Sequence, residues 1–144
     1  MAAQRIIGVD FGTSTSVIRV KRYEGGKPAG GSAKLDTCSV IFNGMYPAVP
    51  TVIQRVGDNT YYGYDALISR KKARTHQGFK VKLESNIQKE REEARALTEE
   101  FLGYLDRCYR EQSEGGHLGE PDDQERTLIS YPVKWSEETK KFMI

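Results

Sequence analysis

The sequence predicts an α/β protein, with a mixed β-sheet and helices packed on it. Apolar or alternating segments typical of strands occur at residues 6–9, 16–21 and 126–131. Between the second and the third, residues 88–112 place an apolar side chain at every third or fourth position, the repeat of a helix with one buried side. Because strands both precede and follow this helix, we expect a sheet on which the helix packs.

The first two strands are predicted to form a hairpin. Residues 6–9 are a short apolar run of the β type, and residues 16–21 alternate between polar and apolar side chains, as in a half-buried strand. Between them, residues 10–15 are small and polar with Gly12 in the middle, which is typical of a tight turn. The glycine-rich residues 24–34 are expected to form a flexible connection.

The rest of the chain is predicted to contain further short strands and two more helices. Three strands are expected from β-branched, aromatic or alternating residues, at 38–42, 51–56 and 61–63. Two helices are expected after capping residues, at 66–76 after Asp65 and from Ser136 onward. Residues 79–83 are expected to be extended, and residues 115–124 to form a polar loop. The long helix should turn these side chains toward the core: Ala94, Leu97, Phe101, Leu105 and Cys108.

Composition and charge limit the possible functions. Charged residues make up 29% and hydrophobic residues 38% of the chain, which is the composition of a folded globular domain. Lysine and arginine total 22 against 20 aspartates and glutamates, so the net charge of +2 gives no reason to expect a nucleic-acid partner. No apolar run is long enough for a membrane span, and residues 1–9 lack a secretory leader pattern, so the predicted location is the cytoplasm. Cys38 and Cys108 are expected to be unreactive thiols.

Residues 10–15 are the strongest candidate for a functional site. A strand delivers one carboxylate, that of Asp10, into a turn of glycine and hydroxyl residues. Such a turn can direct several backbone N–H groups at one point and so bind an oxyanion, with Gly12 allowing close approach. Asp10 would hold a hydrated Mg²⁺ that bridges to the phosphates. Three hydroxyl side chains would add hydrogen-bond donors, those of Thr13, Ser14 and Thr15.

This turn differs from the two common glycine-rich phosphate loops. The sequence has neither G-x-x-x-x-G-K-[ST] nor G-x-G-x-x-G here, and the expected element after the turn is a strand instead of a helix. On the residues alone, an ordinary β-hairpin turn without a ligand is the alternative interpretation.

Residues 8–14 resemble the first phosphate motif of the actin-like ATPase superfamily, in the form found in DnaK-type (seventy-kilodalton heat-shock) chaperones. Later segments resemble that family in the same order along the chain, at residues 41–44 with 50–53, 57–66, 79–83 and 128–132. Trp135, Lys141, Phe142 and Met143 fit the helix that follows in divergent members of the family. The resemblance therefore covers nearly the whole chain.

The resemblance implies a fold and a division of the chain. Residues 1–144 would form the first lobe of an actin-like, ribonuclease H-like ATPase domain, which is incomplete without a second lobe. The core subdomain would comprise about residues 1–40 and 125–144, and a smaller attached subdomain would comprise about residues 41–124 with the long helix. The second phosphate loop, the adenosine-binding motif and the substrate-binding domain would lie beyond residue 144.

The resemblance also implies that residues 79–83 supply a catalytic lysine, which would act together with Asp10. Lys82 matches the spacing of standard members, counted from Phe79, whereas Lys80 matches the divergent members. In an extended segment both side chains would point the same way. Either lysine would place positive charge beside the γ-phosphate and the attacking water; two solvated surface lysines are the alternative.

The activity implied by the resemblance is slow hydrolysis of Mg-ATP to ADP, which drives a conformational change in a chaperone. Client polypeptides and co-chaperones would bind through other regions. The isolated chain is expected to bind ATP weakly or not at all, to show no ATPase activity, and to self-associate through apolar residues at 142–144. The alternatives are the first lobe of an actin-like filament protein, a sugar or acid kinase of the same superfamily, or a non-catalytic interaction module.

Overall fold

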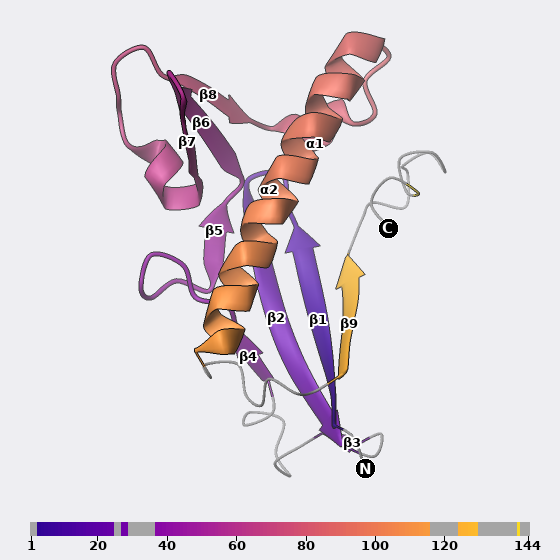
Figure 1. Ribbon diagram of the computed structural model, residues 1–144. Coiled ribbons are helices and arrows are strands. Elements are labelled where there is room, and N and C mark those ends of the chain that lie inside the picture. The colour runs from indigo at the N-terminus through magenta and orange to yellow at the C-terminus, as the bar shows by residue number, and fades with distance from the viewer. Residues whose placement is uncertain (1–2, 25–26, 29–36, 116–123, 130–140, 142–144) are drawn as a thin grey trace.

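The computed structural model describes residues 3–24, 27–28, 37–115, 124–129 and 141. These residues form a mixed α/β arrangement of two β-sheets and a long helix (Figure 1). The α/β class expected from the sequence is therefore confirmed. Three expected features lie outside the described residues, namely the helix from Ser136, residues 130–131 of the last strand and most of the loop at 115–124.

The larger sheet is built around a long hairpin. Its strands are β1 (Ala3–Phe11), β2 (Thr15–Glu24), β3 (Lys27–Pro28), β4 (Thr37–Ser39), β5 (Ala48–Pro50) and β9 (Gln124–Ile129). β1 and β2 pair antiparallel until Phe11 lies opposite Ser16. β9 pairs parallel to β1, whereas β3, β4 and β5 each pair antiparallel with β2. This confirms the strands expected at 6–9 and 16–21 and, as far as residue 129, the strand expected at 126–131.

A smaller sheet of three antiparallel strands lies beside the larger one (Figure 1). Strand β6 (Val52–Val56) is in the centre, with β7 (Asn59–Tyr62) and β8 (Arg74–Gln77) on its two sides. The 3-10 helix η1 (Gly63–Leu67) follows β7. The strands expected at 51–56 and 61–63 correspond to β6 and to the end of β7, and the strand expected at 38–42 is the shorter β4.

The prediction of a helix at residues 66–76 is wrong. After the short η1, the chain becomes extended again and pairs with β6 as β8. Asp65 lies within the first turn of η1 instead of capping a longer helix. The physical reason is that residues 68–76 contain only Ile68 and Ala73 as apolar side chains, so a helix here would have no apolar side to bury. Pairing with β6 satisfies the backbone hydrogen-bonding groups instead.

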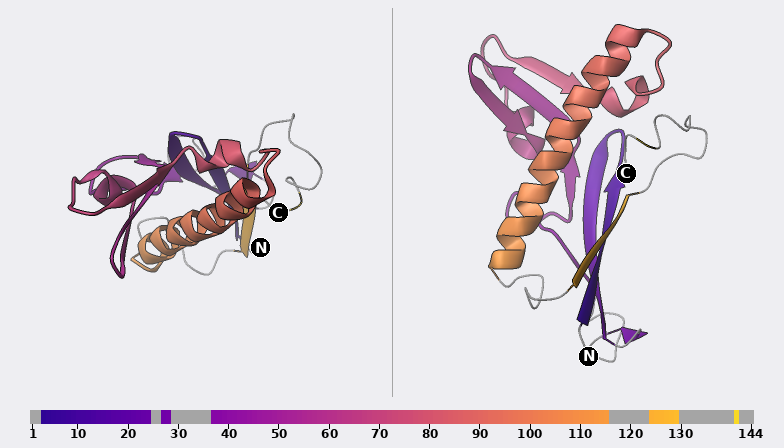
Figure 2. Two further views of the ribbon diagram at one scale, coloured as in Figure 1. Left: turned by 90° about the horizontal axis from the view of Figure 1, so that it is seen from above. Right: turned by 45° about the vertical axis from the view of Figure 1, so that its right-hand side comes forward.

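Helix α2 (Gln88–Glu114) confirms the long helix expected at 88–112. It lies along one face of the larger sheet, and its N-terminal half also runs beside the smaller sheet (Figure 1, Figure 2). Ala94, Phe101 and Leu105 are buried as expected, whereas Leu97 and Cys108 are only partly buried. The buried side of α2 also includes three side chains that the apolar repeat did not indicate, Thr98, Tyr109 and Ser113.

One hydrophobic core joins α2 to both sheets. At the end of β1, the ring of Phe11 has its centroid 6.1 Å from that of Phe79 and 6.2 Å from that of Phe101. All three rings are buried, together with Ile53 of the smaller sheet. Burial of a side chain of this kind contributes about 1.5–3 kcal/mol to stability. The end of β1 is therefore held in place by packing from α2 and from the segment that follows the smaller sheet.

Residues 79–83 form a helical turn, which corrects the expectation of an extended segment. Helix α1 (Phe79–Lys82) begins after Gly78, whose φ of 69° lies in the left-handed region that favours glycine. Phe79 and Leu83 are both buried. A spacing of four residues brings two side chains to the same side of a helix. The alternation of charged and apolar residues over five positions is compatible with a strand and with a helical turn. The burial of both Phe79 and Leu83 favours the helical turn.

A buried arginine connects β1, α2 and β9. Arg5 is fully buried, and its Nη1 donates hydrogen bonds to Tyr109 Oη at 3.0 Å and to Ser113 Oγ at 2.7 Å. Tyr109 Oη in turn donates to Glu125 Oε1 at 2.6 Å, and this carboxylate oxygen lies 3.7 Å from Arg5 Nη1. Arg5 and Tyr109 are 104 positions apart in the sequence, so no local pattern could have predicted the network.

Candidate functional site

The turn between β1 and β2 allows only glycine at its first position. Residues 12–15 connect Phe11 to Ser16, the last pair of the hairpin. A Cβ atom added to Gly12 would lie 2.1 Å from the carbonyl oxygen of Thr15, much closer than real Cβ atoms approach any atom. The backbone therefore folds back on itself within the turn. Three hydroxyl side chains follow Gly12, and all three are exposed to solvent: Thr13, Ser14 and Thr15.

Thr51 holds the turn from the side of the smaller sheet. Its backbone N–H donates a hydrogen bond to the carbonyl oxygen of Ser14 at 2.9 Å. Its Oγ1 lies 2.8 Å from Ser16 Oγ, and both of these hydroxyl side chains are buried. The conformation of the turn is thus fixed both at its tip and at the start of β2.

Lys80 reaches the turn from helix α1. Its Nζ donates a hydrogen bond to the carbonyl oxygen of Phe11, the residue directly before Gly12. The same nitrogen lies 5.6 Å from the centroid of the Phe11 ring. Burial lowers the pKa of the Lys80 ammonium, and the nearby negative charge of Asp10 opposes that effect. The structure therefore places the Lys80 ammonium at the end of β1, within range of the negative charge of Asp10.

Lys82 does not share this position. Side chains two residues apart on a helix point in nearly opposite directions. The side chain of Lys82 is exposed, whereas that of Lys80 is partly buried. The expectation that both lysines point the same way was wrong, because it assumed a strand. Of the two candidates, Lys80 is the one beside the turn.

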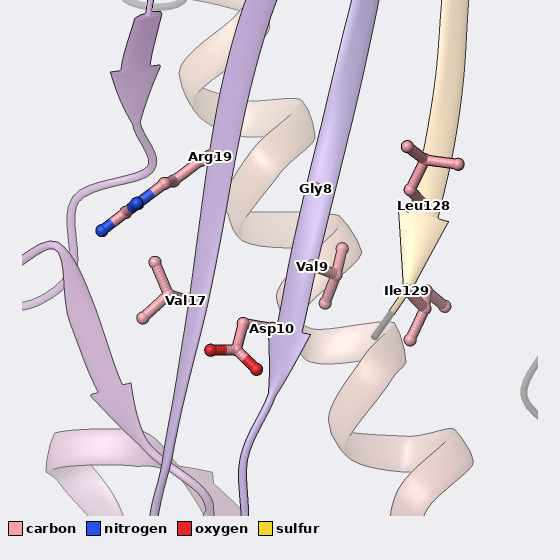
Figure 3. A pocket seen from close by; sticks show the side chains of 7 residues that line it. All are labelled: Gly8, Val9, Asp10, Val17, Arg19, Leu128 and Ile129. Carbon is pink, nitrogen blue, oxygen red and sulfur yellow. The ribbon is translucent and has the colours of Figure 1, made fainter. Parts of the chain in front are cut away.

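Asp10 lies on the face of the larger sheet that points away from α2. Its neighbour Phe11 is buried in the core, and successive side chains of a strand point to opposite faces. The exposed carboxylate of Asp10 borders a surface hollow of about 540 Å³, which the guanidinium of Arg19 also borders (Figure 3). Strands β1, β2 and β9 supply the lining residues: Gly8, Val9, Asp10, Val17, Arg19, Leu128 and Ile129.

A second hollow, of about 340 Å³, lies between the turn and the smaller sheet. Its lining consists of Thr13, Ser14, Pro50, Thr51, Val52, Leu67, Gln77 and Gly78. A volume of this size falls within the range of small-molecule sites. Among the described residues, the polar side chains that line it are hydroxyls and one amide, which can donate hydrogen bonds to an anion.

The donor set at the turn suits a cation that brings most of its own ligands. Within the described ranges, no group of three or more His, Cys, Asp or Glu side chains could hold a metal ion. Asp10 offers one exposed carboxylate beside the turn. Mg²⁺ commonly keeps several waters and takes one or two protein carboxylates together with phosphate oxygens. The residues present therefore fit a hydrated Mg²⁺ that arrives with a phosphate ligand.

Comparison with protein-family models gives no match for this chain, and comparison with curated protein sequences gives none either. In the part of the chain that the structure describes, no helix is both long and apolar enough to cross a membrane.

Sequence reasoning missed Ser16 and Thr51 as parts of this site. The sequence pattern predicts Ser16 only as the first residue of an alternating strand and Thr51 only as a β-branched strand residue. They are 35 positions apart, and only the fold brings their hydroxyls together. A buried hydroxyl residue next to the candidate turn would have been the available signal, because such groups require a partner.

Proposed function

We propose that this chain is the first lobe of an ATP-binding domain of the actin-like ATPase kind, and that its β1–β2 turn holds the phosphates of Mg-ATP. The observation that carries the proposal is the hydrogen bond from the Lys80 ammonium to the carbonyl oxygen of Phe11, directly before Gly12 and near Asp10. The ammonium thus lies at the start of a hydroxyl-rich turn, within range of the negative charge of Asp10. Phosphoryl transfer depends on such groups for positioning and charge stabilisation.

The turn would bind phosphate oxygens through its backbone and its hydroxyls. Gly12 keeps the backbone compact, because the carbonyl oxygen of Thr15 occupies the space that a side chain would need. Thr13 and Ser14 line the hollow of about 340 Å³, where their hydroxyls can donate to an oxyanion. The Thr51 N–H already engages the carbonyl oxygen of Ser14, so the peptide groups are oriented before a ligand arrives.

Asp10 would act on the phosphates only through a cation. Magnesium, when bound with the nucleotide, would supply positive charge that offsets the negative charge of the phosphates. The exposed carboxylate of Asp10 can hold water molecules of the hydrated ion. Without the ion this carboxylate would repel the phosphates, so nucleotide binding at the turn should depend strongly on Mg²⁺.

Lys80 would stabilise negative charge on the phosphoryl group that is transferred. The Lys80 side chain is partly buried, so its charge is less screened by water than that of the exposed Lys82. Its hydrogen bond to Phe11 fixes the distance of the ammonium from the turn. Because burial lowers the pKa of Lys80 and the charge of Asp10 raises it, the aspartate helps to keep the amine protonated.

Within the superfamily we propose the DnaK-type branch, which is supported by the resemblance of residues 131–143 to that branch. In this proposal ATP is hydrolysed slowly to ADP, and the resulting conformational change reaches a substrate-binding region. Client polypeptides and co-chaperones would bind to parts of the protein other than these residues.

The test compares Lys80→Met with Lys82→Met in the binding of Mg-ATP to the 144-residue chain, followed by amide NMR. Methionine keeps an apolar stem of similar length and removes the charge. The sequence leaves weak or absent binding open, and the turn already held by Thr51 and Lys80 favours weak, millimolar binding by the wild-type chain. Lys80→Met should weaken it about tenfold, as for the loss of a charge-assisted hydrogen bond, and Lys82→Met should leave it unchanged.

Two outcomes would contradict the proposal. One is that both lysine substitutions have the same effect on binding. The other is that millimolar Mg-ATP causes no spectral change in the wild-type chain.

A further inference from the structure

Thr51 stands where the chain passes from one sheet to the other. β5 ends at Pro50 as part of the larger sheet, and β6 begins at Val52 as the centre of the smaller sheet. Thr51 lies between these strands and is only 1% exposed. Any movement of the smaller sheet relative to the larger one must therefore act on this residue.

The same residue holds the turn by two separate bonds. Its N–H donates to the carbonyl oxygen of Ser14 at 2.9 Å, and its Oγ1 is 2.8 Å from Ser16 Oγ. The first bond constrains the tip of the turn, and the second constrains the first residues of β2. Since both hydroxyls are buried, removal of either one deprives the other of this partner.

A second connection returns from the smaller sheet to the turn. Val52, next to Thr51, pairs directly with Gln77 at the end of β8. Gly78 follows, and helix α1 then carries Lys80, whose Nζ donates to the carbonyl oxygen of Phe11. The turn, the start of β6, the end of β8 and α1 thus form a closed ring of bonded contacts. The hollow of about 340 Å³ is lined by members of this ring.

We propose that Thr51 is a positioning residue that couples the β1–β2 turn to the smaller sheet, so that an anion held by the turn alters the smaller sheet. The identity of the anion as the phosphates of ATP rests on the function proposed above. The coupling itself rests on the hydrogen bonds of Thr51 and is measurable without a ligand.

The first experiment uses the ligand-free chain and the substitution Thr51→Val, which keeps the shape and removes the hydroxyl. The amide signals of Gly12 and Thr13 should shift, and hydrogen exchange at residue 51 should become about tenfold faster. Ser16→Ala removes the same hydroxyl pair from the other side and should give the same result. Thr51→Ser keeps the hydroxyl and should restore the wild-type signals of the turn.

The matched control is Thr98→Val on α2. Thr98 is also fully buried, and its hydroxyl has no hydrogen-bond partner among the residues that the structure describes. Its replacement should therefore leave the turn unchanged. If Thr51→Val and Ser16→Ala leave the signals of Gly12 and Thr13 as in the wild type, or if Thr98→Val shifts them equally, Thr51 does not position the turn.

The second experiment adds millimolar Mg-ATP and follows Ile53 and His76, which pair across β6 and β8 and do not line the hollow. In the wild type their signals should move together with those of Gly12, and in Thr51→Val only Gly12 should respond. Changes confined to Gly12 in the wild type would overturn the coupling and leave the proposed function intact. No change at Gly12 would instead overturn the proposed function, and the ligand-free comparison would still decide whether Thr51 positions the turn.

Discussion

Replacing Gly12 with alanine should destabilise the protein far more than replacing Gly8, although both glycines belong to the same hairpin. The Cβ atom that Gly12→Ala introduces would lie 2.1 Å from the carbonyl oxygen of Thr15, whereas an ordinary van der Waals contact is 3.4–4 Å. At Gly8 the nearest atom to a new Cβ is the carbonyl oxygen of Arg19 at 3.8 Å, which is an ordinary contact. Gly8→Ala is therefore the matched control.

The magnitude follows from what must move to make room. The overlap at Gly12 is with backbone, which cannot rotate away as a flexible side chain can. Widening the turn would strain two bonds that hold it, from Thr51 N–H to Ser14 and from Lys80 to Phe11. Overpacking of this kind typically costs about 1–3 kcal/mol, and each strained hydrogen bond adds a fraction of about 1 kcal/mol. We expect the free energy of unfolding to fall by about 2 kcal/mol, against less than about 0.5 kcal/mol for the control.

The assay is urea denaturation of the two variants and the wild type, followed by circular dichroism. The change in midpoint at constant slope gives the change in the free energy of unfolding. Equal stabilities of Gly12→Ala and Gly8→Ala would refute the reasoning, since they would mean that the turn opens without cost.

Two further predictions concern other parts of the fold. Burial lowers the pKa of His76, and the positive charges of Arg55 and Arg74 lower it further. The imidazole therefore takes up its proton at a higher pH in the unfolded chain than in the native protein. The free energy of unfolding should fall as the pH drops from neutral through the lowered pKa. His76→Gln should reduce this loss between about pH 7.5 and about pH 5.5 in urea midpoints, and an unchanged loss would contradict it. Tyr109→Phe removes a hydroxyl that accepts a hydrogen bond from buried Arg5 at 3.0 Å, so the free energy of unfolding should fall by about 1–3 kcal/mol in urea denaturation. An unchanged value would show that the arginine does not depend on this partner.

The elements that sequence reasoning predicted well are those with a long, regular pattern. The 27 residues of α2 repeat the helical period several times. An apolar pattern of that length is not expected to fit a helix by chance. The β1–β2 hairpin combines an alternating strand with a glycine-containing turn, and both signals predict the same hairpin. The turn at Gly12 was identified as the candidate site for the same reason, because its composition is unusual within a few residues.

The parts that sequence reasoning could not predict depend on contacts between distant residues. Lys80 and Phe11 are 69 positions apart, and the choice of Lys80 over Lys82 depends on the helical turn that buries Phe79. That turn was expected to be a strand, because five residues of alternating character are compatible with both periods. The sequence pattern predicts Ser16 and Thr51 only as residues of two separate strands. It is the fold that places Ser16 Oγ and Thr51 Oγ1 2.8 Å apart.

The central claim is that the β1–β2 turn is a phosphate site, and amide NMR of the whole chain tests it most directly. The titration uses Mg-ATP, with Mg-tripolyphosphate as the probe for phosphate alone and adenosine as the control without phosphate. The account predicts that Mg-ATP and Mg-tripolyphosphate shift the amides of Gly12, Thr13 and Ser14 more than any others, and that adenosine leaves these three unchanged. Equal shifts with adenosine, or no shift at these residues with either phosphate compound at millimolar concentration, would contradict the account.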